Sequence, residues 1–166
     1  GIAFDGDADR LGAVDDNGKV MWGDQLMILF ARSVLADQPG ATIIGEVKCS
    51  RTLYADIEAH GGVAVMGKTG HSLIKDKMRE TGAALAGEMS GHIFFAHRFF
   101  GFDDGVYAGL RLVELLSHAE GPVAGLLADV PQPFSTPEIR RDCPESLKLR
   151  LVAALVDHFT ARGDKV

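Results

Sequence analysis

The sequence lacks the features that define several large protein classes. It has only two cysteines among its 166 residues, Cys49 and Cys143, and no CxxC pair, which argues against a zinc knuckle or a disulfide framework. No pair of its six histidines has HxxxH-type spacing, so a three-histidine zinc site is not expected. No apolar run reaches the roughly 18 residues of a membrane-spanning helix. Basic residues, 17 against 23 acidic ones, form no clusters, so neither nucleic acid nor an anionic membrane is an expected partner.

What the chain does contain is typical of a folded globular protein. Hydrophobic residues make up 46% and charged residues 24%, with a formal net charge of -6. Isolated cysteines are normally reduced in the cytosol, and we expect a cytoplasmic protein. The chain opens without methionine, on the strand-like run Gly-Ile-Ala-Phe, so we expect an internal piece of a longer protein.

Short apolar runs alternate with amphipathic stretches along the chain. Asn17-Gly18 between two apolar runs predicts a β-hairpin. The alternation predicts an α/β fold, a layered mixed sheet with flanking helices. Strands are expected at residues 2–4, 11–14, 19–22, 41–47, 63–66, 83–86, 93–95 and 135–142. Helices are expected to run through residues 26–34, 53–59, 73–78, 106–116 and 145–162.

Several polar side chains precede the predicted helices. Asp24 and Ser50 are expected to cap the first two helices, because short polar side chains accept hydrogen bonds from the free amides of a helix N-terminus. Asp103 and Asp104 are expected to cap the helix that follows them. The five phenylalanines between residues 94 and 102 are expected to pack in the core.

The sharpest local signal is an acidic loop at residues 5–10, Asp-Gly-Asp-Ala-Asp-Arg, directly after the first predicted strand. Three carboxylates at alternating positions can converge on one cation if the loop curls, and Gly6 and the small Ala8 allow a curl. Their mutual repulsion requires a counter-ion. Carboxylate oxygens suit a hard divalent ion, and Mg²⁺ is preferred where a phosphate also binds. Arg10 can hold a phosphate or pair with an aspartate.

Three other interpretations of this loop compete with a magnesium site. A solvated acidic turn needs no ligand. An EF-hand fails on detail, because it requires glycine at its sixth position and glutamate at its twelfth, where this chain has Arg10 and Asp16. A phosphatase of the haloacid-dehalogenase type also places Asp-x-Asp after a strand, with Asp5 as nucleophile, but it usually continues with Thr or Val where this chain has Asp9.

Four segments together resemble the α-D-phosphohexomutases, the phosphoglucomutase/phosphomannomutase family. The acidic loop is similar to that family's DGDGDR metal loop, with Ala8 replacing the central glycine. Residues 87–92, Gly-Glu-Met-Ser-Gly-His, look like its sugar-recognition loop. Residues 45–50 and 68–71 are similar to the segments that supply an active-site lysine and histidine. The four matches occur in family order, and the resemblance covers essentially the whole chain.

The family has four domains, and the resemblance implies how the chain maps onto them. Residues 1–19 would be the end of the metal-binding second domain, and residues 20–131 the sugar-recognition third domain. Residues 132–166 would be the truncated start of the phosphate-binding fourth domain. The first domain, with its phosphoserine loop, would be absent, so we expect little or no turnover from the chain alone.

The resemblance also implies the metal ligands. Asp5, Asp7 and Asp9 would bind Mg²⁺, and Arg10 would lie beside the transferred phosphate in a catalytic role. Elementary chemistry agrees, because a cation that bridges a transferring phosphoryl group neutralises its developing charge.

The remaining roles implied by the resemblance concern the sugar. Glu88 and Ser90 would bind sugar hydroxyls, for which a carboxylate acceptor beside a hydroxyl is chemically suited. Lys48 and His71 would contact the substrate and take part in catalysis. His92 would also be catalytic, and either histidine can carry a proton.

The implied function is Mg²⁺-dependent interconversion of hexose 1-phosphate and hexose 6-phosphate, with mannose or glucose as the sugar. It would pass through a phosphoserine and a bisphosphorylated intermediate. The expected partners are the phosphorylated hexose and the missing first and fourth domains of the same chain. Two alternatives stay open, a non-enzymatic divalent-cation-binding α/β module and a phosphatase of the Asp-x-Asp type, but neither explains the loop around Glu88.

Overall fold

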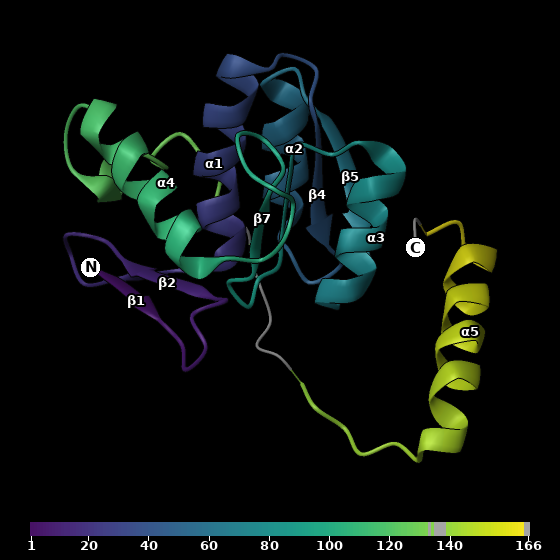
Figure 1. The fold of residues 1–166 in the computed structure, drawn as a ribbon. Coiled ribbons are helices and arrows are strands. Elements are labelled where there is room, and N and C mark those ends of the chain that lie inside the picture. The colour runs from purple at the N-terminus through teal and green to yellow at the C-terminus, as the bar shows by residue number, and fades with distance from the viewer. Residues whose placement is uncertain (133, 135–138, 165–166) are drawn as a thin grey trace. The chain divides into compact units, whose positions relative to one another are not determined.

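The computed structural model describes residues 1–132, 134 and 139–164. The chain divides into two compact units, Gly1–Pro133 and Phe134–Val166. Strands and helices alternate through most of the first unit, as the sequence predicts (Figure 1). The predicted α/β class with a mixed sheet is confirmed.

A four-stranded sheet forms the centre of the first unit. Its strands are β4 (Thr42–Glu46), β5 (Val63–Gly67), β6 (Leu85–Gly87) and β7 (Ile93–Phe95), in the spatial order β5-β4-β6-β7. β4 is parallel to β5 and to β6, whereas β7 is antiparallel to β6. The three parallel strands therefore end at the same edge of the sheet, and the loops that follow them meet there.

Helices cover both faces of this sheet. α1 (Gly23–Asp37) and α2 (Arg51–Ala59) pack on one face, and α3 (His71–Thr81) packs on the other. Ile43 of β4 belongs to the core under α1 and α2, whereas its neighbour Ile44 belongs to the core under α3. Because successive strand residues point to opposite faces and both faces are covered, Ile43 and Ile44 are both apolar although they face opposite sides.

A second, three-stranded antiparallel sheet holds the acidic loop. β1 (Ile2–Phe4) pairs with β2 (Leu11–Val14), which pairs with β3 (Val20–Met21) across the predicted hairpin. The acidic loop connects β1 to β2. α4 (Gly105–His118) packs against β1, β2 and β7, and a short 3₁₀ helix, η1 (Val123–Gly125), follows it. α4 thus joins the small sheet to the central sheet within one unit.

Two of the predicted helix caps are present. Ser50 caps α2, because its Oγ accepts a hydrogen bond from the amide of Thr52 at 3.2 Å. Asp104 caps α4, because its Oδ1 accepts from the amide of Tyr107 at 2.8 Å. Both caps are local contacts of the kind that a sequence pattern can reveal.

The predicted caps at Asp24 and Asp103 are wrong. α1 already begins at Gly23, and Asp24 Oδ2 instead accepts from the amide of Ser50 at 2.9 Å, which ties α1 to the start of α2. Asp103 lies one residue before the true cap of α4, and its Oδ1 accepts from Lys75 Nζ at 3.1 Å. Neither carboxylate accepts a hydrogen bond from the first amides of its helix. Each binds a partner that is distant in sequence.

The phenylalanine cluster is only partly in the core. Phe94 and Phe95 are buried in the central sheet, as predicted. The prediction is wrong for Phe100 and Phe102, which are 80% and 44% exposed. β7 ends at Phe95, so the later phenylalanines lie on the loop before α4, where the rings of Phe100 and Phe102 stack at 5.9 Å.

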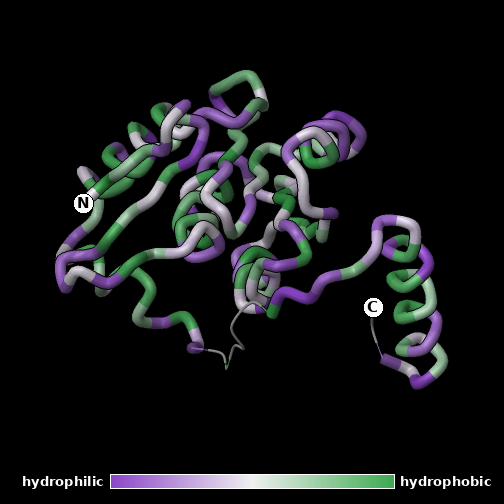
Figure 2. The backbone as a smooth tube through the Cα atoms, turned by 90° about the horizontal axis from the view of Figure 1, so that it is seen from below, coloured by the Kyte–Doolittle hydropathy of each residue, from purple (hydrophilic) through white to green (hydrophobic). Residues whose placement is uncertain are grey.

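The described part of the second unit contains one helix, α5 (Glu145–Ala161), which confirms the predicted helix at 145–162. Apolar and polar residues alternate around its turns (Figure 2). Of the predicted strand at 135–142, residues 135–138 lie outside the described residues, and residues 139–142 form no strand. Within the described residues, no helix combines the length and apolarity needed to cross a membrane.

Candidate functional site

Three loops that carry predicted site residues meet at one edge of the central sheet. They comprise residues 47–50, 68–70 and 88–92, which follow the carboxyl ends of β4, β5 and β6. Open α/β sheets bind ligands at this edge, outside the carboxyl ends of their parallel strands. The topology thereby brings three separate parts of the sequence to one place.

The acidic loop is curled as a cation site requires. Ala8 has a φ angle of +60°, and its amide donates to the carbonyl oxygen of Asp5 at 3.2 Å. Left-handed backbone is uncommon outside glycine, and here it turns the loop back on itself. As a result, carboxylate oxygens of Asp5, Asp7 and Asp9 lie within 4.8 Å of one another. Hard oxygen donors so arranged fit a divalent cation such as Mg²⁺.

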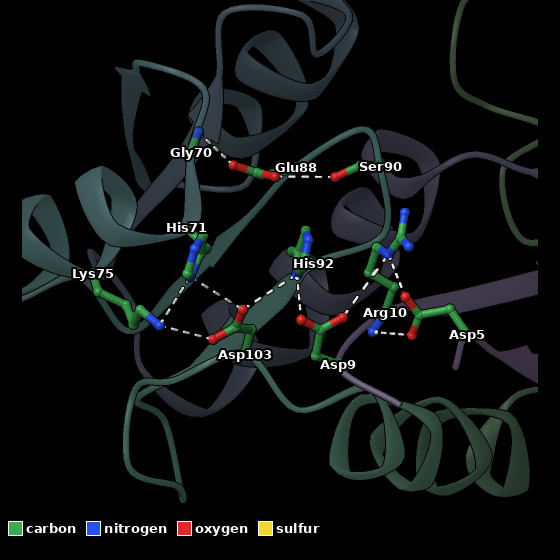
Figure 3. Close-up of polar contacts among 10 residues, drawn as sticks. All are labelled: Asp5, Asp9, Arg10, Gly70, His71, Lys75, Glu88, Ser90, His92 and Asp103. Atoms are coloured by element: carbon green, nitrogen blue, oxygen red, sulfur yellow. Dashed lines mark hydrogen bonds and ion pairs between the residues drawn. The ribbon is translucent and has the colours of Figure 1, made fainter. Parts of the chain in front are cut away.

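Arg10 is bound to the first aspartate of this loop. Arg10 Nε donates to Asp5 Oδ2 at 2.5 Å, and the Arg10 amide donates to Asp5 Oδ1 at 3.2 Å (Figure 3). Desolvation opposes ionisation of Asp5, but the contacts with Arg10 outweigh it and lower the pKa of the Asp5 carboxyl. Asp5 in turn raises the pKa of Arg10. Each partner therefore keeps the other charged.

Glu88 is buried, and both of its carboxylate oxygens accept hydrogen bonds within the protein. Oε1 accepts from the amide of Gly70 at 2.8 Å, and Oε2 accepts from Ser90 Oγ at 3.0 Å (Figure 3). These bonds hold the 88–92 loop against the start of α3. Each carboxylate oxygen has a further lone pair, so Glu88 can still accept a sugar hydroxyl.

The acidic loop and the 88–92 loop are joined through their main chains. Arg10 and His92 form an antiparallel bridge, and the amide of Leu11 donates to the carbonyl oxygen of Gly91 at 3.0 Å. Gly91 has a φ angle of +98°, and a Cβ there would lie 2.6 Å from the carbonyl oxygen of Leu11. Only glycine fits such a position. The two predicted halves of the site are therefore fixed neighbours.

A surface hollow of about 290 Å³ lies beside this junction. Its volume is near the lower end of ordinary ligand pockets, roughly 300–1,000 Å³. Polar side chains of both loops contribute to its wall, which consists of Ala3, Phe4, Asp5, Arg10, Leu11, Gly12 and Ser90.

A polar cluster lies between the acidic loop and α3. His92 Nδ1 is 3.2 Å from Asp103 Oδ2 and 3.7 Å from Asp9 Oδ2. Lys75 Nζ is 3.1 Å from Asp103 Oδ1 and 3.3 Å from His71 Nδ1. The rings of His71 and His92 stack with their centroids 6.1 Å apart (Figure 3). Partial burial opposes ionisation of Asp103, but the Lys75 hydrogen bond contributes to a net lowering of the Asp103 pKa.

A second buried carboxylate, Glu46, supports the loops at the end of β4. Glu46 is fully buried; its Oε2 accepts from Thr69 Oγ1, and its Oε1 accepts from the amide of Met89 at 3.0 Å. A buried charge is tolerated only when it is paired and hydrogen-bonded. Lys48 Nζ lies 3.5 Å from Glu46 Oε1, so the predicted lysine lies at the same edge of the sheet.

Reasoning from the sequence missed Glu46, Lys75 and Asp103. Glu46 left one signal, a charged residue inside a predicted apolar strand. Asp103 reaches the cluster because it pairs with Phe94 in an isolated bridge, a tertiary contact without a sequence signature. Lys75 looks like an ordinary surface lysine until α3 is placed beside the loop before α4.

Fold and site together define a layered α/β domain in which an acidic loop of the small sheet lies beside the 88–92 loop at the edge of the central sheet. Residues 22–134 match the family model described as phosphoglucomutase/phosphomannomutase, alpha/beta/alpha domain III. The chain therefore belongs to the phosphoglucomutase/phosphomannomutase family.

Individual relatives agree with this assignment. The chain is 53% identical over 155 residues to the phosphomannomutase/phosphoglucomutase of Pseudomonas putida, covering 93% of this chain and 34% of the relative. It is 54% identical over 164 residues to a phosphoglucomutase of Neisseria meningitidis, covering 99% of this chain and 35% of the relative. A solved family protein from Burkholderia thailandensis superposes with a TM-score of 0.78 and 54% identity, covering 82% of this chain and 30% of that chain. The chain thus spans about a third of the length of the curated relatives.

Proposed function

We propose that this chain carries the cation-binding and sugar-binding loops of a Mg²⁺-dependent phosphohexomutase that interconverts the 1-phosphate and 6-phosphate of mannose or glucose. The observation that carries the proposal is the bridge between Arg10 and His92, which holds the acidic loop beside the 88–92 loop. One phosphorylated sugar can then contact both loops at once, with its phosphate at the first and its hydroxyls at the second.

Asp5, Asp7 and Asp9 are the proposed ligands of Mg²⁺, because their oxygens already converge and carry the charge that a hard cation needs. When bound, the ion supplies positive charge beside the phosphoryl group. Arg10 adds a second positive group. Its contacts with Asp5 and Asp9 run through Nε, so the terminal nitrogens of the guanidinium can bind phosphate oxygens.

Glu88 and Ser90 are the proposed ligands of the sugar hydroxyls. The Gly70 amide fixes the Glu88 carboxylate, so the acceptor is already oriented when the sugar arrives. Lys48 and His71 complete substrate binding. Recognition of hydroxyls, rather than of one phosphate, allows a bisphosphorylated intermediate to be held in two orientations, so that either end can face one phosphoserine.

His92 is the proposed proton carrier. Its Nδ1 faces Asp103 Oδ2 at 3.2 Å and Asp9 Oδ2 at 3.7 Å, and these contacts orient the ring. Nε2 is then the nitrogen available to a sugar hydroxyl. His71 stacks on the same ring and can assist as a second catalytic histidine.

The rest of the catalytic apparatus belongs, in this proposal, to other domains of the parent protein. Residues 1–19, 20–131 and 132–166 are then parts of the second, third and fourth domains, and the phosphoserine lies in the first. The chain alone should show little turnover. Both cysteines are free thiols, which supports a reducing, cytoplasmic location.

The test is an assay of the full-length parent on glucose 1-phosphate and mannose 1-phosphate, with Mg²⁺ and after chelation. Asp7→Asn removes one carboxylate of the cation site and should lower kcat/KM by roughly 100-fold, equivalent to about 2.7 kcal/mol. Asp76→Asn removes an exposed aspartate of α3 and is the matched control, with unchanged activity expected. Full activity of Asp7→Asn, or full activity without Mg²⁺, rejects the proposal.

Assays of the same full-length protein also distinguish the mutase from the two alternatives, a phosphatase and a non-enzymatic cation-binding module. A phosphatase of the Asp-x-Asp type would release inorganic phosphate from the sugar and leave a trappable phosphoryl group on Asp5. A non-enzymatic module would bind Ca²⁺ tightly and would not respond to hexose phosphates. Membership of the family favours the mutase over both.

A further inference from the structure

Beside the acidic loop, the structure gathers a second group of side chains that can bind a cation. Asp9, His92 and Asp103 each offer one ligand atom, and these atoms lie within 4.8 Å of one another. The group differs in chemistry from the acidic loop, because it offers one imidazole nitrogen and two carboxylates. Only Asp9 is shared between the two groups.

The nitrogen of this group lies within ion-pair distance of both carboxylates but makes no hydrogen bond among the described residues. His92 Nδ1 is shielded from solvent and makes no hydrogen bond within the described residues. Asp103 Oδ2 is 3.2 Å away, but the two atoms do not align as a hydrogen bond. Buried polar atoms are almost always satisfied in native proteins, so an unsatisfied nitrogen between two carboxylates indicates a ligand position.

We propose that Asp9, His92 and Asp103 form a binding site for a borderline divalent transition metal, with Zn²⁺ as the expected occupant. Imidazole and carboxylate donors together suit Zn²⁺, whereas Mg²⁺ takes oxygen ligands. Ligand atoms around a tetrahedral zinc ion lie about 3.3–3.4 Å apart. The distances from His92 Nδ1 to Asp103 and Asp9, 3.2 and 3.7 Å, are close to this spacing.

Lys75 does not occupy the Asp103 oxygen that faces His92. Lys75 binds Asp103 through Oδ1, which leaves Oδ2 directed at His92 (Figure 3). With three protein ligands, the fourth position of a tetrahedral ion would take water. Occupation would take up the histidine that the proposed mutase reaction uses for proton transfer. Inhibition of turnover by Zn²⁺ at saturating Mg²⁺ is therefore a consequence that rests on the proposed function, whereas the site itself does not.

The test is a titration of the 166-residue chain with Co²⁺ in excess Mg²⁺, followed by visible absorption. Co²⁺ absorbs strongly in four- or five-coordinate sites and weakly in octahedral oxygen sites. We expect a strong band that added Zn²⁺ abolishes. His92→Ala and the shape-conserving Asp103→Asn should each weaken Co²⁺ binding by roughly 100-fold, since loss of even an outer-shell partner costs a metal site about 10–100-fold.

Two variants act as controls. Asp7→Asn alters only the acidic loop, and His118→Ala removes an exposed histidine of α4, so both should keep the band. A weak octahedral spectrum alone, or a band lost in Asp7→Asn and kept in Asp103→Asn, overturns the proposal, because the ion would then occupy the acidic loop. A band lost only in His118→Ala overturns it as well. If His92→Ala fails to fold, the Co²⁺ titration of Asp103→Asn tests the site by itself.

The two proposals can fail separately. The Co²⁺ titration measures no turnover, so its failure leaves the mutase assay untouched. Conversely, the parent protein could prove inactive as a mutase while the chain still gives a Co²⁺ band that depends on Asp103. That band would still support the metal site.

Discussion

Arg10 and His92 form an antiparallel main-chain bridge that links the small β1–β2–β3 sheet to the central sheet at the site itself. Arg10 directly precedes β2, and His92 directly precedes β7. The acidic loop therefore cannot shift without moving the 88–92 loop. Such fixed placement is what catalysis by positioning requires of its binding groups.

This junction should be sensitive to a single methyl group at Gly91. Gly91→Ala places a Cβ against the carbonyl oxygen of Leu11 at a φ angle of +98°, and should lower the free energy of unfolding by about 3 kcal/mol or more. Gly40→Ala is the control, because Gly40 has a φ angle of +79° and open space around it, so only about 1 kcal/mol should be lost. Urea denaturation measures both. Equal losses would show that the contact with Leu11 is unimportant.

Glu46 should matter more for stability than its position at a strand end suggests. Glu46→Ala empties a fully buried site and leaves the partly buried amide of Met89 without an acceptor, and should lower the free energy of unfolding by about 2–3 kcal/mol. Glu58→Ala removes an exposed glutamate of α2, and should change the stability by less than about 0.5 kcal/mol. Thermal and urea unfolding of both variants decide the point. A neutral Glu46→Ala would mean that the loops do not depend on this carboxylate.

The two thiols should differ in reactivity. Burial, aided by neighbouring carboxylates, raises the pKa of Cys49 from its ordinary 9.0 to about 12, so the reactive thiolate is scarce at pH 8. A thiol-specific reagent should therefore modify Cys143 quickly in the folded chain and both cysteines in urea. Rapid modification of two thiols in the folded chain would contradict the burial of Cys49.

The raised pKa of Cys49 also predicts how stability depends on pH. Below pH 9.0 the thiol is protonated in the folded and the unfolded chain, so its contribution to stability is fully present. Above pH 9.0 the unfolded chain releases the proton, whereas the folded chain keeps it until about pH 12. Stability should therefore fall across this window. Cys49→Ala should show a smaller fall between pH 8 and pH 10, and an unchanged slope would contradict the assignment.

The phenylalanines before α4 should divide into two energetic classes. Phe94→Ala empties a fully buried site and should lower the free energy of unfolding by about 3–5 kcal/mol. Phe100→Ala removes a ring that is mostly exposed to solvent, so the free energy of unfolding should stay within about 0.5 kcal/mol of that of the unsubstituted chain. Chemical denaturation of the pair checks this, and a large loss at Phe100 would show that its ring is packed.

The regular elements could be predicted because their causes are local. β4 was expected at residues 41–47 and spans Thr42–Glu46, since a buried strand between helices must be apolar on both faces. The Ser50 cap is equally local, because donor and acceptor lie two residues apart. The acidic loop was found because its three carboxylates occupy alternating positions in one short segment.

The hydrogen bonds that hold the site loops in place could not be predicted in the same way. Asp24, Asp103 and Glu46 have partners 26, 28 and 43 residues away, and no local pattern identifies such partners. For Asp24 and Asp103, helix capping was the best local explanation available. Tertiary contacts gave each of them a stronger partner, which is the usual way in which a fold overrides a local preference.

The spatial order of the central sheet has one further consequence. β5 is an outer strand, paired only with β4 among the described residues, and its Val63 and Met66 are largely exposed. A row of unpaired backbone groups with apolar neighbours is a template onto which a foreign strand can add. The brevity of β5 and the lysine that follows it, Lys68, work against such addition, so replacement of that lysine by an apolar residue would promote self-association.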